Sequence, residues 1–143
     1  MGVLRASLEA VYFVITRKIL NKVAFGKPQL GTYQFATRLL QKWRKYCCKI
    51  NRFPSTVYFI GDTPESDIRG TNEFNETTEN DWYSILVKTG VYKDGAETSY
   101  PPRKRCENVF DAVGFAYERE HNTTTKGEIV SEIDYDTCQK VSK

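Results

Sequence analysis

A short apolar run that ends on an acidic loop restricts the fold of this chain more than any other stretch of its sequence. Residues 57–60 are apolar or aromatic and predict a buried strand, which ends at Gly61 and Asp62. Asp67 follows five residues after Asp62, where a helix would begin. Ligands bind at the carboxyl ends of the strands in parallel α/β sheets. Two carboxylates there predict a site for a hard divalent cation such as Mg²⁺.

A simpler interpretation of the two acids is structural. Asp62 could simply end a strand, and Asp67 could simply flank a helix N-terminus, where negative charge is favoured. A second element upstream, the turn Gly26-Lys27-Pro28, favours the metal-site interpretation over this one. Gly26 would let the backbone approach a ligand closely, and Pro28 would constrain its neighbours.

Basic residues are concentrated in the first part of the chain. Residues 1–61 hold eleven Lys or Arg and one acid, whereas residues 62–143 hold ten Lys or Arg and seventeen acids. The basic stretch 38–52, with Trp43 and Tyr46 among its charges, could attract nucleic acid, phosphate, an anionic membrane or an acidic partner. It could equally be a solvated helix face. No recognised nucleic-acid motif accompanies it, so the nucleic-acid signal is weak.

The cysteines and the N-terminal segment exclude several classes of protein. The four cysteines contain no CxxC pair, which argues against a structural zinc site and fits a reduced, intracellular chain. The apolar run at residues 10–15 is too short to span a bilayer, so we expect no transmembrane segment. We expect an amphipathic helix over residues 4–20, and the basic residues around it resemble a transit peptide.

Hydrophobic periodicity predicts alternating helices and strands. We expect helices at residues 4–20, 33–48, 109–117 and from 65 to 70 or a few residues beyond, and strands at 23–25, 56–60 and 82–87. Residues 72–81 and 93–105 are polar and predict surface loops, and residues 121–143 predict a polar, disordered tail behind a core of residues 1–120. The alternation predicts an α/β fold with an open parallel sheet and flanking helices.

Four blocks in this order resemble haloacid dehalogenase-like (HAD) hydrolases. They begin at Gly26-Lys27-Pro28, Gly61-Asp62-Thr63-Pro64, Ile85-Leu86-Val87-Lys88 and Asn108-Val109-Phe110-Asp111. Over residues 8–118, the chain is similar to the class IIA subgroup with the cat eye syndrome critical region type of protein. The resemblance implies a Rossmann-like core and Mg²⁺-dependent hydrolysis of a phosphorylated small molecule through an aspartyl-phosphate. It also implies a mitochondrial location for many relatives.

The resemblance assigns roles to individual residues. Lys27 takes the place of the catalytic lysine, which adds positive charge beside the phosphate, although an isolated turn lysine would be solvated. Asp62 and Asp67 take the places of the metal-site acids, where Asp67 would bind a metal-bound water or orient Lys27. The loop residues Gly26, Pro28 and Gly61 would support them.

The chain departs from the family pattern at its front. In the family, the nucleophilic Asp and a phosphate-binding Ser or Thr precede the lysine, but no Asp occurs before Lys27 here. The first motif and most or all of the cap domain, which selects the substrate, are therefore missing from their expected place. A DxD at Asp134-Tyr135-Asp136-Thr137 would require a permuted fold, so we interpret it as part of an acidic tail.

These observations lead to one main hypothesis and two alternatives. The chain is expected to be the C-terminal half of a HAD-type phosphatase core, inactive by itself, with a partner or the missing N-terminal half covering the sheet. It could instead be a non-catalytic HAD-fold binding protein, or a binder of nucleic acid or anionic surfaces through its basic helix. In an intact family member, we expect that helix to pack by its Phe35, Leu39 and Trp43 face.

Overall fold

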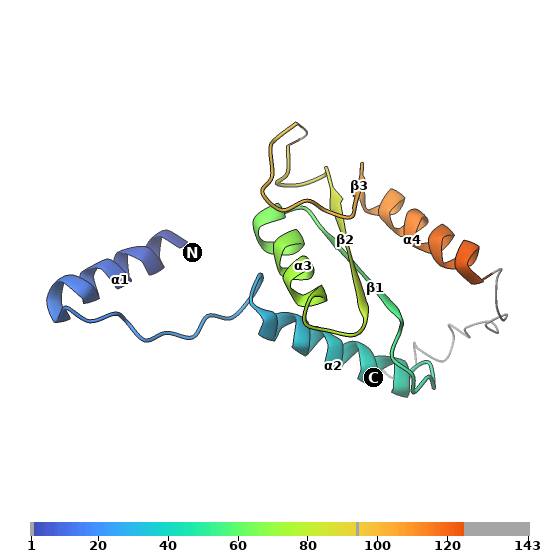
Figure 1. Cartoon of the computed structure of the whole chain (residues 1–143), viewed down its shortest axis with the longest axis horizontal. Helices are drawn as coiled ribbons and strands as arrows, with labels where there is room; N and C mark the ends of the chain where they lie inside the picture. The colour runs from blue at the N-terminus through green and yellow to red at the C-terminus, as the bar shows by residue number, and fades with distance from the viewer. Residues whose placement is uncertain (1, 94, 125–143) are drawn as a thin grey trace, which may run out of the picture.

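The fold is a small parallel sheet between helices. The structure, a computed structural model, describes residues 2–93 and 95–124. Its elements are α1 (Gly2–Thr16), α2 (Leu30–Tyr46), β1 (Thr56–Gly61), η1 (Pro64–Ile68), α3 (Arg69–Asn75), β2 (Asp81–Val87), β3 (Lys104–Cys106) and α4 (Val109–Thr124). The three strands pair in the order β1-β2-β3 (Figure 1). The predicted α/β class, a Rossmann-like fragment with flanking helices, is therefore correct.

The strands are parallel, so their carboxyl ends meet at one edge of the sheet. Residue pairs run from Thr56 with Asp81 to Gly61 with Leu86 between β1 and β2. β2 then pairs with β3 from Ile85 with Lys104 onward. The register places the end of β1 beside the end of β2, and the loops that leave these strands start close together.

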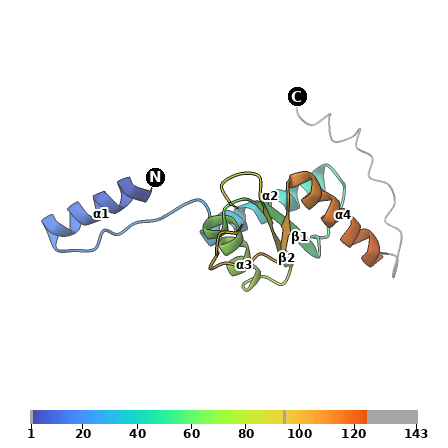
Figure 2. The ribbon, with the colours of Figure 1, turned by 90° about the horizontal axis from the view of Figure 1, so that it is seen from above.

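Helices cover both faces of the sheet, with α2 and α3 on one side and α4 on the other (Figure 2). On the α2–α3 side, Tyr33, Phe74 and Trp82 are buried against Val57 and Phe59. The α4 side contains a second core, which consists of Ile85, Val87, Cys106 and Ala112 with Tyr58, Ile60, Tyr83 and Phe115 packed against it. Successive side chains of β1 thus point to opposite faces, and both faces are covered, which explains the continuous apolar run.

Helix α1 lies apart from the sheet and the other helices (Figures 1 and 2), and it contains no buried residue. It ends at Thr16 and not at Leu20 as predicted. The hydroxyl of Thr16 donates to the carbonyl of Tyr12, and the N–H of Lys18 donates to that hydroxyl. Such local side-chain bonds compete with continuation of the helix.

Two predictions of strands and loops were wrong. Residues 23–25 are not a strand, because no neighbouring strand in the described part of the chain pairs with them, and Val23 and Phe25 are exposed. Conversely, the predicted loop 93–105 contains most of β3. β3 shows no apolar alternation, since only Cys106 of its three residues is buried, and its pairing with β2 defines it.

Two helices extend into segments that were predicted to be loop or tail. Helix α3 continues into the predicted loop 72–81 as far as Asn75, because Phe74 is drawn into the core against Tyr33 and Trp82. Helix α4 continues past the predicted core boundary at residue 120 to Thr124. The rest of the predicted tail, including the DxD at Asp134, lies outside the described residues.

Helix α2 packs by a different face from the one expected for an intact family member. Tyr33 is buried and Ala36 is partly buried against the sheet. A stripe on the other side of the helix, here called the α2 stripe, is more than half exposed; it consists of Phe35, Leu39, Trp43 and Tyr46. An apolar surface of this kind usually marks a contact with another part of a protein or a partner.

The central strand should carry much of the stability. Ile85 is completely buried on β2, so Ile85→Ala should lower the free energy of unfolding by about 2–4 kcal/mol through lost burial and a residual cavity. Urea unfolding followed by circular dichroism measures this change. The matched control Ile19→Ala, at an exposed isoleucine, should change it by less than about 0.5 kcal/mol. Equal effects of the two substitutions would contradict the described core.

Candidate functional site

The acidic loop lies at the carboxyl end of β1. After Gly61, the chain forms a π-helical turn, η1, which places Asp67 back against the end of the strand. A side chain at Gly61 would collide with the side chain of Asp67, so this position requires glycine for close approach. Single π-turns are rare and often mark functional sites.

Asp67 is a buried carboxylate whose oxygens are all engaged by this chain. Its side chain is 2% exposed. Oδ2 accepts hydrogen bonds from the N–H groups of Asp62, at 3.2 Å, and Thr63, at 3.1 Å. Oδ1 has no well-angled hydrogen bond but lies 2.5 Å from Nζ of Lys27. This arrangement places Asp67 to orient Lys27.

Lys27 reaches this carboxylate from a turn that is distant in sequence. Gly26 has a φ of 91°, in the region that favours glycine, and its carbonyl accepts the N–H of Gln29 at 2.9 Å. Helix α2 starts directly after the turn. The Lys27 side chain is 46% exposed, so its ammonium group contacts Asp67 and still faces solvent. The ion pair therefore brings Lys27, on the turn that contains Gly26 and Pro28, to Asp67 of the acidic loop.

Asp62 is only half buried, and a second loop contacts it. Oδ2 accepts the N–H of Val91 at 2.8 Å, and the carbonyl of Asp62 accepts the N–H of Tyr92 at 3.1 Å. The Val91 bond is the main cause that holds the pKa of the Asp62 carboxyl below its usual value, and the charge of Lys27 acts in the same direction. A side chain at Gly90 would collide with Asp62. Sequence reasoning missed the contribution of Gly90 and Val91, although both lie in one of the four blocks.

The donor set fits a magnesium ion held through one carboxylate. The described residues contain no group of three or more His, Cys, Asp or Glu that could hold a metal. Mg²⁺ commonly uses one or two carboxylates and takes its other ligands from water and phosphate. Asp62 is half exposed and could serve as that one carboxylate, whereas Asp67 supports the site through Lys27.

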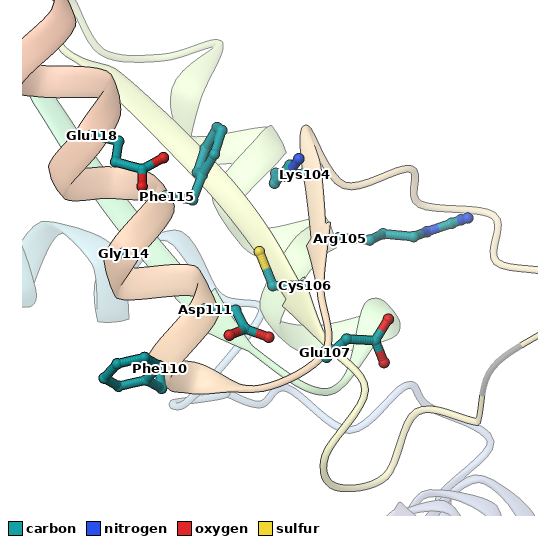
Figure 3. Close-up of a pocket in the computed structure, with 9 residues that line it drawn as sticks. All are labelled: Lys104, Arg105, Cys106, Glu107, Phe110, Asp111, Gly114, Phe115 and Glu118. Carbon is teal, nitrogen blue, oxygen red and sulfur yellow. The ribbon is translucent and has the colours of Figure 1, made fainter.

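A cleft of about 510 Å³ lies at the other edge of the sheet, between β3 and α4. Figure 3 shows Cys106 and Phe115 between these two elements. None of the predicted site residues lines this cleft. Burial raises the pKa of the Cys106 thiol, which keeps it protonated and makes it a weak nucleophile. The cleft therefore adds nothing to the chemistry of the acidic loop.

The lowered pKa of Asp62 has a consequence for stability. The contribution of this carboxylate is fully present above the unfolded pKa of about 3.8 and disappears as the pH falls through the lower folded pKa. The stability difference between the wild type and Asp62→Asn should therefore narrow as the pH falls from about 6 to about 3. Urea unfolding of both proteins at a series of pH values measures this difference in the free energy of unfolding. Glu65→Gln, at an exposed acid on the same loop, is the control and should not reproduce this narrowing.

Comparison with known proteins shows which family the chain belongs to. The family described as HAD-hydrolase-like matches residues 24–113. The chain is 33% identical over 118 residues to the cardiolipin synthase (CMP-forming) / mitochondrial hydrolase fusion protein of Schizosaccharomyces pombe, covering 82% of this chain and 19% of that protein. It is 32% identical over 136 residues to the mitochondrial hydrolase YKR070W of Saccharomyces cerevisiae, covering 82% of this chain and 37% of that protein. It thus spans well under half the length of either relative, and it belongs to the HAD-hydrolase-like family.

Proposed function

We propose that this chain provides the lysine and the acidic metal-binding loop of a Mg²⁺-dependent phosphatase that acts on a phosphorylated small molecule. The observation that carries the proposal is the convergence of Lys27, Asp62 and Asp67 at the carboxyl end of β1. Lys27 and Asp67 are distant in sequence, yet they form an ion pair beside Asp62, which is partly exposed.

Each residue has a distinct part in this proposal. Asp67 holds the ammonium group of Lys27 in place, and the exposed part of Lys27 offers a positive charge to a phosphate group. Asp62 offers its carboxylate to Mg²⁺, which would neutralise the charge of a bound phosphate. The N–H of Val91 keeps that carboxylate ionised and fixes its direction.

We further propose that the chain by itself does not hydrolyse phosphate esters. A phosphoryl group must be transferred to a carboxylate that is close to both the metal and the lysine. Asp62 and Asp67 have other tasks, and the described residues supply no third metal-ligating side chain to the cluster. The nucleophile would then come from the first motif of a longer or separate polypeptide.

Two open surfaces support this assignment. β1 is an edge strand in the described part of the chain, since it pairs with β2 alone. The α2 stripe is exposed next to it in sequence. An unpaired strand edge and an exposed apolar helix face are surfaces that the rest of a Rossmann-like core would cover.

A non-catalytic binding protein is the second candidate. It is favoured by the contacts of the loop at Gly90 and Val91 with Asp62, which stabilise the acidic loop without any ligand. In that case, the fold would be retained for binding through the α2 stripe or the open sheet edge.

A mitochondrial location is proposed from the names of both relatives. Among the described residues, no helix is long and apolar enough to cross a membrane.

The proposal predicts that the purified chain does not turn over a generic phosphate ester in the presence of Mg²⁺. The physical reason is that the described residues place no further carboxylate beside Asp62 and Asp67 to act as the nucleophile. A colorimetric phosphate-release assay over a range of Mg²⁺ concentrations measures it, with buffer alone as the blank. Mg²⁺-dependent turnover that is lost in Asp62→Asn and retained in Glu65→Gln would contradict the predicted inactivity.

Magnesium binding provides a test that does not depend on turnover. Mg²⁺ should shift the amide resonances of Asp62 and Val91, because ion binding at the carboxylate disturbs the hydrogen bond that joins them. Titration followed by ¹⁵N NMR measures the shifts. They should disappear in Asp62→Asn and persist in Glu65→Gln. Unchanged spectra of the wild type at high Mg²⁺ concentration would count against the metal site and favour the non-catalytic candidate.

A further inference from the structure

Tyr33 is the point at which α2 contacts the acidic turn. Its side chain is completely buried, although it lies only three positions into the helix. Its ring packs against the rings of Phe59, Phe74 and Trp82 at centroid distances of 5.4, 5.7 and 5.9 Å. The ring is therefore fixed by both the sheet and α3.

The hydroxyl group of Tyr33 is directed at the backbone of η1. It donates to the carbonyl of Ser66 at 3.2 Å and to the carbonyl of Asp67 at 3.3 Å. The hydroxyl of Thr71 donates to the same Asp67 carbonyl at 2.7 Å. A side chain at Gly70 would collide with the tyrosine hydroxyl, so α3 leaves room for it. Two hydroxyl groups thus hold the backbone of the residue whose side chain binds Lys27.

The hydroxyl remains a donor over the physiological range. Burial is the main cause that raises the pKa of Tyr33 to about 12, and the charge of Asp67 acts in the same direction. A neutral phenol can donate to a carbonyl, whereas a phenolate cannot.

Tyr33 also has a short connection to Lys27. Lys27 is followed by two residues and then by Leu30, where α2 starts. Whatever fixes the first turn of α2 against η1 therefore limits where Lys27 can lie relative to Asp67. The Tyr33 hydroxyl supplies the polar contact between α2 and η1 in the described residues.

We propose that Tyr33 is a positioning residue of the candidate site, whose hydroxyl aligns the Lys27 turn with the turn that carries Asp67. This role rests on the proposed function, because the aligned ion pair is the part of the site that would face a phosphate group. Tyr33 itself does not touch the substrate or the metal. It acts through the backbone carbonyls of Ser66 and Asp67.

Hydrogen exchange of the full chain tests this role without requiring activity. The amides of Asp62 and Thr63 donate to Oδ2 of Asp67, so their exchange reports how firmly that carboxylate is held. In Tyr33→Phe, these amides should exchange about fivefold faster relative to the amides of β2, the change expected for loss of one ordinary hydrogen bond. Tyr46→Phe removes the same atom from an exposed position on the same helix and should leave the ratio unchanged.

The ratio of the exchange rates at Asp62 and Thr63 to those in β2 separates an alignment role of Tyr33 from a general effect on stability. If Tyr33 only fills the core, Tyr33→Phe should accelerate exchange equally at Asp62, Thr63 and the β2 amides, or at none of them, and either result overturns the proposal. A second readout is the acylation rate of Lys27 by an amine reagent, which should rise in Tyr33→Phe as the ion pair loosens, and not in Tyr46→Phe. Both readouts are independent of Mg²⁺ binding and turnover. Failure of the proposed function would therefore not change the exchange and acylation results expected here.

Discussion

The buried carboxylate of Asp67 is the group around which this site is arranged. A carboxylate with so little exposure is stable in the ionised form only when hydrogen-bond donors and a positive charge surround it. Here two backbone N–H groups and Lys27 provide them. The need to satisfy one buried charge therefore joins two turns that are far apart in the sequence. It also explains why glycine is needed at position 61, where any side chain would occupy the space of that carboxylate.

The two acids of the loop differ because their surroundings differ. Asp67 is enclosed and contacts the lysine, whereas Asp62 is partly exposed and its carboxylate accepts the N–H of Val91 and a long contact from Thr63. A metal ion needs accessible oxygens, so we propose Asp62 as the ligand and Asp67 as the support for Lys27. The resemblance to HAD hydrolases implied that Asp67 either binds a metal-bound water or orients Lys27. Its ion pair with Lys27 is the reason that we propose the second role.

The small sheet explains why the site is proposed to be incomplete. Three strands with helices on both faces give Tyr33, Trp82 and Ile85 a buried environment, so the part of the fold around the acidic loop is well packed. The α2 stripe and the outer edge of β1 are not covered in the described residues. These surfaces lie on the elements that lead into the site. Under the proposed function, a segment that covers them would be well placed to contribute the nucleophile.

The sequence by itself determined the features that depend on neighbouring residues. The apolar run before Gly61 predicted β1 because a strand covered on both faces is continuously apolar, and the spacing of Asp62 and Asp67 predicted an acidic loop after it. Only the tertiary structure decided which side of α2 is buried, since Tyr33 and the α2 stripe are both apolar at helical spacing and periodicity cannot choose between them. It also decided that residues 104–106 form a strand and that Val91 contacts Asp62. These features arise from pairing and burial between distant segments, and no local pattern of residues carries that information.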